Sequence, residues 1–493
     1  MVQLINSIFI VRKVGIVVKK ILICLLLLGI LVTVAVIGIT HINKFRSPEI
    51  NYGNLPIVRI TTENGKFPKD KEIYLNCSFE ITNCENSDHN FKVEMKNSYD
   101  SKEGDGGVGV RLRGNTTMAY EKKPYRIKFK NEQSLFGLTE AKSWVLLADY
   151  LDQSNIRNYA AMTLGNEVFQ NLDFTATPHH VILEFNGEYQ GVYLLCEQMD
   201  EKDGRTDVEV DKNELYTNYA KTEFPFLIEM DNYISIDPAI ADADKLILEN
   251  YFPIEIKYPA SKDRGLYNEQ DIIYDYITEY MLAVRTTLKT KEKIKVSFRD
   301  ELVGYEDLID VDSLIDYVLL NELMYNPDSI WKSCYMYKTQ NIVDEETGDI
   351  LEYGKLKFGP IWDFDASMSW KFTNEPFDQS YIEGSRATTV FCGNIFFIDF
   401  IRDEDNYLLC KKRWEETRGG VKEVVDYLRD YKAIIKEPSR SDALVYYGDT
   451  GKFQFDMQYD YVRLFLLDRI DYFDELFALE HKAFLFAAGL PVD

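Results

Sequence analysis

The hydrophobic periodicity of the chain changes from that of strands to that of helices, and this change limits the folds open to it. Apolar and polar residues alternate in Leu55–Thr62 and Val108–Arg113, as on strands with one buried face. From about residue 400 onward, apolar residues recur at helical spacing, as in Gly420–Ile434 and Tyr459–Leu479. We therefore predict an α+β fold with a β-rich small lobe, a helical large lobe and a cleft between them.

The middle of the chain mixes both patterns. Asn186-Gly187 is a strong turn signal between the apolar runs Val181–Asn186 and Tyr189–Gln198, which predicts a β-hairpin. The other strands and helices that we predict are Trp144–Ala148, Phe226–Met230, a hairpin of Tyr335–Lys338 with Leu356–Phe358, and helices over Tyr159–Phe169, Tyr267–Thr287, Val311–Tyr325 and Tyr407–Trp414.

An apolar segment near the N-terminus predicts a membrane anchor. Ile21–Ile39 has nineteen residues without a charge, and a helix of that length nearly matches a bilayer core of about 30 Å. Four basic residues precede the segment and fewer follow it, which predicts a cytoplasmic N-terminus and an extracytoplasmic location for residues 41–493. A cleaved signal peptide is the alternative, with the same final location. The predicted regions are a cytoplasmic N-terminus (1–20), a single transmembrane helix (21–40), a linker (41–54), a globular domain (55–480) and a C-terminal tail (481–493).

The composition excludes several function classes. The net charge is −25, and a chain this acidic is a poor partner for nucleic acid, whose phosphates attract Lys and Arg. The seven cysteines have no CxxC metal spacing, and the five histidines form no zinc signature. Cys77 and Cys84 are close enough in sequence to pair across a hairpin, and the sequence leaves this open.

Two carboxylates near residue 364 indicate a cation site. Asp363 and Asp365 follow a short apolar strand and a Gly-Pro break, and in an extended segment they would point the same way. Enclosed carboxylates repel each other unless a cation compensates. Mg²⁺ is commonly held by one or two carboxylates together with substrate phosphates. The alternative is an acidic turn after a strand.

Two upstream stretches could complete a phosphoryl-transfer site. Pro327 ends a predicted helix, so Asp328 lies in the following loop, where it could act as a general base on a hydroxyl. A cationic strand face, with Lys123 and Lys128, could neutralise phosphate charge. Protein kinases use the same order of strand lysine, loop acid, hairpin and metal-binding acid. Their usual GxGxxG, HRD and APE signatures are absent from this sequence.

Six motifs in order carry a resemblance to one family. They are RLRGNTT (111–117), KKPYRIKF (122–129), WVLLADYLDQSNIRNYAA (144–161), GVYLLCEQMD (191–200), NELMYNPDS (321–329) and FGPIWDFD (358–365). The chain resembles the spore-coat protein H (CotH) kinase family of atypical, secreted-type protein kinases. The resemblance implies a kinase-like two-lobed fold over the 55–480 domain with an ATP–Mg²⁺ (or Mn²⁺) site. It also implies transfer of the ATP γ-phosphoryl to Ser or Thr hydroxyls of surface or coat proteins.

The resemblance also implies roles for individual residues. Asp328 would be the catalytic acid/base and Asp363 the metal-binding acid, with Asp365 a second ligand or an orienting residue. At the phosphates, the resemblance implies Lys123 or Lys128, together with the turn Arg113, Gly114 and Asn115. The acidic partner of the lysine would be Glu197 or Glu167. Trp362 or Tyr125 would lie near the adenine. We predict a structural role for Asp152, Ser154, Arg157 and Asn158, with a buried Arg–Asp pair that fastens the helix after residue 156.

One departure from the kinase pattern leaves alternatives open. Protein kinases place an Asn five residues after the catalytic Asp as a second metal ligand, whereas this chain has Ser333, a weak ligand. The sequence is therefore compatible with one metal ion or with two. It is also compatible with an active enzyme or with a non-catalytic surface binding or adhesion module. A kinase acting on a glycan or a small molecule is a further alternative, because only the acceptor differs.

Overall fold

The computed structural model describes most of the chain after residue 49. The described residues are 50–95, 107–202, 204–210, 223–237, 240–249, 252–264, 271–330, 332–368, 393–448 and 451–492. The chain divides into two units, Met1–Ile50 and Asn51–Asp493, and every described helix and strand belongs to the second. The predicted anchor at residues 21–40 lies outside the described residues. Within the described ranges, no helix is both long and apolar enough to cross a bilayer.

The first half of the unit is an eight-stranded sheet that curls on itself. Its strand order is β1-β7-β8-β6-β5-β4-β2-β3, and an additional β1–β2 pairing closes seven of the strands into a ring. The ring encloses a hydrophobic core of its own, to which Ile127 and Trp144 belong. The strands are β1 (Ile57–Thr62), β2 (Leu75–Thr82), β3 (Phe91–Val93), β4 (Val108–Leu112), β5 (Tyr125–Gln133), β6 (Ala141–Leu147), β7 (His179–Phe185) and β8 (Glu188–Glu197).

The predicted hairpin at residue 186 is confirmed. β7 pairs antiparallel with β8, and the two residues between them have positive φ, 52° at Asn186 and 81° at Gly187. Asn and Gly tolerate this left-handed conformation, which the tight turns of hairpins require. Cys77 and Cys84 are both free thiols.

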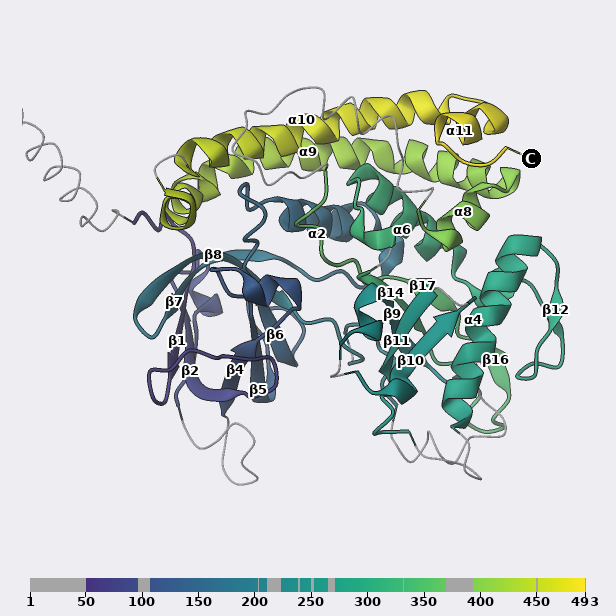
Figure 1. Cartoon of the computed structure of the whole chain (residues 1–493), viewed down its shortest axis with the longest axis horizontal. Coiled ribbons are helices and arrows are strands. Elements are labelled where there is room, and N and C mark those ends of the chain that lie inside the picture. Colours follow the sequence, from purple (N-terminus) through teal and green to yellow (C-terminus); the bar gives the residue numbers. More distant parts are fainter. Residues whose placement is uncertain are drawn as a thin grey trace, which may run out of the picture. The chain divides into compact units, whose positions relative to one another are not determined.

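A second sheet lies beside the first in Figure 1. Its order is β10-β11-β9-β14-β17, and the β14–β17 hairpin confirms the prediction made for this segment. The predicted helical large lobe therefore also contains a sheet, which the sequence showed only as separate strands. The strands are β9 (Phe226–Met230), β10 (Lys245–Leu248), β11 (Phe252–Tyr258), β14 (Cys334–Lys338) and β17 (Leu356–Phe358), with two-stranded sheets of β12 (Ile294–Lys295) and β13 (Leu302–Val303) and of β15 (Ile342–Val343) and β16 (Ile350–Glu352) elsewhere.

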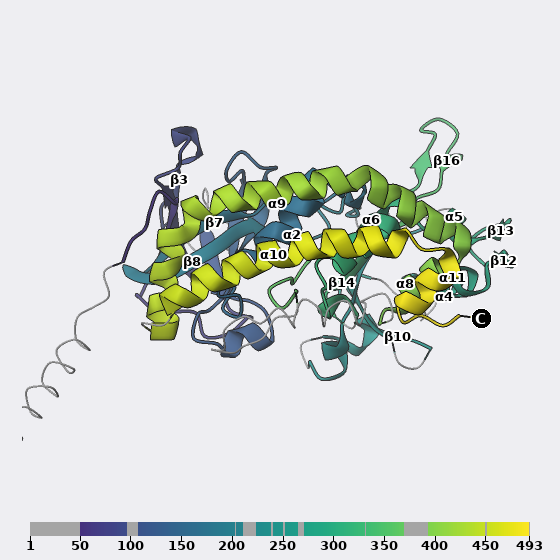
Figure 2. The ribbon, with the colours of Figure 1, turned by 90° about the horizontal axis from the view of Figure 1, so that it is seen from above.

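A layer of helices lies along one side of both sheets in Figure 1, and α4 (Ile272–Thr290) lies beside the second sheet. The α-helices are α2 (Arg157–Glu167), α4 (Ile272–Thr290), α5 (Tyr305–Leu308), α6 (Val311–Leu323), α8 (Ile395–Ile401), α9 (Glu404–Tyr447), α10 (Gly451–Phe477) and α11 (His481–Ala487). Helices α9 and α10 run side by side in both ribbon views (Figures 1 and 2). Helix α9 packs on β8 of the first sheet and on α6, which in turn packs on β17 of the second.

The C-terminal helices differ from their prediction in one respect. Two predicted helices, Tyr407–Trp414 and Gly420–Ile434, are parts of the single 44-residue α9. A Gly-Gly pair usually weakens a helix. Here a Cβ on Gly420 would lie 3.2 Å from a methyl carbon of Val168, so the glycine permits close packing beside α2.

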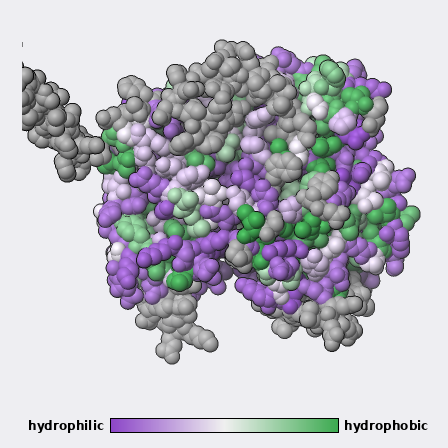
Figure 3. Space-filling model, viewed as in Figure 1, coloured by the Kyte–Doolittle hydropathy of each residue, from purple (hydrophilic) through white to green (hydrophobic). Residues whose placement is uncertain are grey.

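The described surface in Figure 3 is mostly hydrophilic, in keeping with the net charge of −25.

His180 gives the fold a pH dependence that can be measured. Burial lowers the pKa of His180 to about 4, and its ring nitrogens lie 2.8 Å from the Tyr431 hydroxyl and 2.7 Å from the Asn155 carbonyl oxygen. As the pH falls from 6.5 to 4, the unfolded chain binds a proton that the folded ring does not, so stability falls over this window, by roughly 3 kcal/mol. We expect His180→Gln to lose less stability than the wild type between these two pH values in urea unfolding. Equal losses would mean that His180 ionises normally.

Candidate active site

A cavity of about 640 Å³ lies between the two sheets. Its walls include Arg113, Asp328, Trp362, Asp363 and Asp365, five of the residues singled out from the sequence. Contacts across the cavity join the turn after β4 to the segment after β9: the Thr116 and Tyr233 hydroxyls lie 2.7 Å apart. Lys71 donates hydrogen bonds of 2.8 Å to both Asn115 and Asp237. The structure thus brings residues from distant parts of the sequence around one cavity.

The metal-binding candidate Asp363 has a strained backbone. Its φ is 66°, in the left-handed region that non-glycine residues seldom adopt. The Ser333 hydroxyl donates a hydrogen bond of 3.2 Å to the Asp363 carboxylate, and Ser333 also has a positive φ, 53°. The Arg113 guanidinium stacks over Trp362 at 5.2 Å. Strain of this kind costs on the order of 1–3 kcal/mol per residue and clusters at functional sites.

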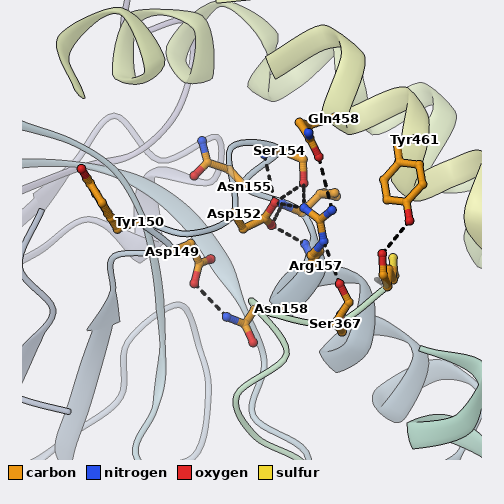
Figure 4. Close-up of polar contacts among 12 residues, drawn as sticks. Asp149, Tyr150, Asp152, Ser154, Asn155, Arg157, Asn158, Ser367, Gln458 and Tyr461 are labelled. Carbon is orange, nitrogen blue, oxygen red and sulfur yellow. Dashed lines mark hydrogen bonds and ion pairs between the residues drawn. The ribbon is translucent and has the colours of Figure 1, made fainter. Parts of the chain in front are cut away.

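Hydrogen bonds hold the segment around Asp363 at several points. The Phe364 N–H donates to the Asn158 side chain at 2.8 Å, and Asn158 donates to Asp149 at 2.8 Å. Farther along, Tyr461 on α10 donates to the Met368 carbonyl oxygen at 2.7 Å (Figure 4). The segment is therefore fixed by α2 on one side and by α10 on the other.

The predicted buried Arg–Asp pair is confirmed at the start of α2. Asp152 and Arg157 are almost wholly buried, and the Arg157 Nη1 lies 2.5 Å from the Asp152 Oδ1. Asp152 also accepts the backbone N–H groups of Ile156 and Arg157, which caps the helix. Arg157 reaches the Ser367 carbonyl oxygen at 3.2 Å, so the pair connects α2 to the segment after Asp365 (Figure 4).

Breaking this pair should destabilise the whole unit. We expect Arg157→Ala to lower the free energy of unfolding by about 3–5 kcal/mol, because it leaves the Asp152 charge buried without its partner. Denaturant unfolding measures the change. Arg429→Ala removes an arginine that pairs with Asp430 on the exposed surface of α9 and should leave the unfolding midpoint unchanged. A loss no larger for Arg157→Ala than for this control would refute the structural role.

Asp328 lies outside helix α6, as predicted, at the start of a short 3₁₀ turn. Its carboxylate pairs with Lys332 at 2.9 Å, and both side chains line the cavity. Burial raises the pKa of Asp328, and the nearby Asp363 charge adds to the rise, while Lys332 opposes it. A carboxylate with a raised pKa is a stronger base for a hydroxyl proton.

The cavity holds more negative charge than its cations neutralise. Burial raises the pKa of Asp365 well above its usual range, with further contributions from Asp363 and Asp149. Burial also raises the pKa of Asp149 to about 7 and that of Asp231 to about 6. Such crowding of carboxylates is the environment in which a bound cation is stabilising.

Several residues implied by the resemblance lie away from the cavity walls. Lys123 donates to the Met118 and Tyr120 carbonyl oxygens at 2.8 and 2.5 Å, and Lys128 projects from β5 near the ring of Tyr74. Neither lysine is among the residues that line the cavity. Of the implied acidic partners, Glu197 accepts a hydrogen bond from the Thr177 N–H, and Glu167 is exposed on α2. Tyr125, the alternative adenine contact, is buried in the core of the first sheet.

The structure also shows site residues that sequence reasoning missed. Lys122, rather than Lys123 or Lys128, forms a buried ion pair with a carboxylate, Asp442 on α9, at 3.0 Å. Lys332 pairs with Asp328, and Asp149 lines a recess beside the cavity. Lys122 is adjacent to Lys123, one of the lysines singled out from the sequence, and Lys122 differs from it in being buried against α9. Asp149 could have been noticed as an acid directly after a buried strand.

Two sheets that flank a carboxylate-lined cavity, with helices packed over them, define this protein as an α+β protein with an acidic site between its sheets. A family model described as CotH kinase protein matches residues 110–473. The chain belongs to this family, as its motifs predicted. A comparison with curated proteins found no match.

The acidic site fits a hard divalent cation. Carboxylate oxygens are the ligands that Mg²⁺ and Mn²⁺ prefer. Within the described residues, no group of three or more His, Cys, Asp or Glu side chains is arranged to hold a metal ion unaided. A Mg²⁺ site needs only one or two carboxylates where waters and substrate phosphates complete it. Asp363 and Asp365 would hold the ion, and Ser333 orients Asp363.

Proposed function

We propose that the chain is an ATP-dependent protein kinase that phosphorylates Ser or Thr hydroxyls of surface or coat proteins. The observation that carries the proposal is the presence of Asp328, Asp363 and Arg113 on the walls of one cavity. Membership of the CotH kinase protein family supports the same reaction class. The proposal includes the membrane anchor at residues 21–40, with the kinase domain outside the cytoplasm.

Each residue has a chemical task in the proposed reaction. The Asp328 carboxylate accepts the proton of the acceptor hydroxyl as its oxygen bonds to the γ-phosphorus, while the bond from that phosphorus to the β,γ-bridging oxygen breaks and ADP leaves with the electron pair. Arg113, whose guanidinium is held by Trp362, neutralises phosphate charge, so the cationic role expected of a strand lysine passes to this arginine. A bound divalent ion supplies charge stabilisation on the phosphates. Lys332 keeps the Asp328 carboxylate in place between turnovers.

A thermal-shift and labelling experiment tests the function. ATP with Mn²⁺ or Mg²⁺ should raise the melting temperature of the full-length chain, because a ligand that binds only the folded state stabilises it, by about 2.7 kcal/mol at 100 times Kd. Label from γ-labelled ATP should then appear on the chain itself or on added protein. ADP labelled in its β-phosphate is the control, since it has no γ-phosphoryl to transfer. Binding without transfer to protein would direct the search to glycan or small-molecule acceptors, and no shift with any metal would favour the binding module.

A further inference from the structure

Asp149 has a buried carboxylate oxygen without a hydrogen-bond partner. It follows β6 in the loop before α2, and its side chain is 8% exposed. Its Oδ1 accepts the hydrogen bond from Asn158, whereas its Oδ2 is buried and has no hydrogen-bond partner among the described residues. A buried acceptor left unsatisfied costs on the order of 1–3 kcal/mol, and more when charged. This arrangement therefore calls for a ligand.

The space beside Asp149 is a recess of about 30 Å³. The recess shares Arg113, Trp362, Asp363 and Asp365 with the large cavity. A space above about 10–15 Å³ can hold a water molecule or an ion of similar size. A single, largely dehydrated cation therefore fits in the recess that Asp149 shares with Asp363 and Asp365.

Asn158 links Asp149 mechanically to those acids. Its Nδ2 donates to Asp149, and its Oδ1 accepts the N–H of Phe364, the residue between Asp363 and Asp365. One amide side chain thus sets the separation of Asp149 from the metal-binding segment (Figure 4 shows the Asp149–Asn158 bond). Asn158 is itself 4% exposed, so its orientation is held by packing.

The two cations that line the recess offset the charge of its three carboxylates only in part. Lys122 lines the same recess, but its ammonium is already bonded to the Val192 carbonyl oxygen at 2.5 Å and to Asp442 at 3.0 Å. Arg113 is stacked on Trp362. Asp149, Asp363 and Asp365 therefore share the recess with excess negative charge.

We propose that Asp149 is a third carboxylate of the metal centre and that a second divalent cation binds in the recess between Asp149 and Asp365. The inference rests on the proposed function, which places the first ion at Asp363 with the nucleotide phosphates. Waters complete the coordination of the second ion, because the carboxylates alone are too few. Asp149 would thereby supply the carboxylate ligand for a second ion that Ser333, a weak ligand, does not.

Counting bound Mn²⁺ tests the inference without measuring catalysis. The full-length chain is saturated with a non-hydrolysable ATP analogue, and Mn²⁺ binding is followed by electron paramagnetic resonance and equilibrium dialysis. We expect two Mn²⁺ per wild-type chain and one for Asp149→Asn, which keeps the acceptor for Asn158 and removes the charge. Asp200→Asn neutralises another carboxyl whose pKa burial raises, away from both cavities, and should still bind two.

Each result has a distinct meaning. Two ions in Asp149→Asn, one ion in the wild type, or loss of both ions in the variant would overturn the second site while leaving the proposed kinase function in place. No ion in the wild type would overturn both. Melting in EDTA controls for folding: Asp149→Asn relieves a buried repulsion and should melt no lower than the wild type. Asp149→Ser, which is smaller and also neutral, serves as the second variant should the first misfold.

Discussion

Asp363→Asn should abolish metal-dependent nucleotide binding. The substitution removes the negative charge that faces the cavity, while asparagine tolerates the positive φ of 66° at this position. Loss of an outer-shell partner typically costs about 10–100-fold in metal affinity, and loss of a direct ligand should cost more. The melting-temperature rise produced by ATP with Mn²⁺ in the wild type should therefore vanish.

Loss of nucleotide binding in Asp363→Asn can be told apart from loss of folding by the melting temperature of the ligand-free variant. Asp363 raises the pKa of Asp365 by repulsion, so its neutralisation relieves that repulsion. The ligand-free variant should melt at or above the wild-type temperature. Asp365→Asn is the comparison that ranks the two acids: a smaller loss of Mn²⁺ affinity is expected, since Asp363 carries the strained backbone and the Ser333 contact. An Asp363→Asn protein that keeps its full Mn²⁺–ATP shift would remove Asp363 from the metal centre.

Asp328→Asn should keep nucleotide binding and lose transfer. A positioned general base contributes about 10²–10⁴-fold to a rate, and asparagine cannot accept the hydroxyl proton. The affinity for Mn²⁺–ATP, obtained from the thermal shift, should stay within a few-fold of the wild-type value. The initial rate of label transfer should fall by about 10²–10⁴-fold. The separation of binding from transfer is what distinguishes a base from a metal ligand.

A surface ion pair provides the matched control for Asp328. Asp242 pairs with Lys245 at 2.9 Å, the same length as the Asp328–Lys332 pair, and it does not line the cavity. Asp242→Asn should leave both binding and transfer at wild-type levels. Equal transfer rates for Asp328→Asn and Asp242→Asn would exclude Asp328 as the base.

The sequence predicted most local elements because their signals are local. The Asn186-Gly187 turn is set by residues adjacent in the chain, and β14 pairs with β17 across a single intervening loop segment. The position of Asp328 after a helix was predictable because Pro327 restricts its neighbour. Asp363 and Asp365 could be identified in the same way, as acids after a strand and a Gly-Pro break.

What the sequence could not predict depends on packing between distant segments. Lys122 is distinguished from Lys123 only by burial against Asp442, which is 320 residues away. The second sheet depends on one long-range pairing, that of β9 with β14, in which Met230 and Cys334 lie more than 100 residues apart. The unpaired oxygen of Asp149 is visible only once α2 and the Asp363 segment are placed together.

The continuous helix α9 has a consequence for how substrates reach the site. A helix of 44 residues spans about 66 Å, and this one acts as a strut, packed directly on β8 of one sheet and through α6 on β17 of the other. The two sheets cannot swing apart as on a hinge without breaking that packing. Relative movement of the cavity walls is therefore confined to loops such as those that carry the Thr116–Tyr233 and Lys71–Asp237 contacts, where the two sides meet. If the cavity binds a nucleotide as proposed, exchange would not require the two sheets to separate.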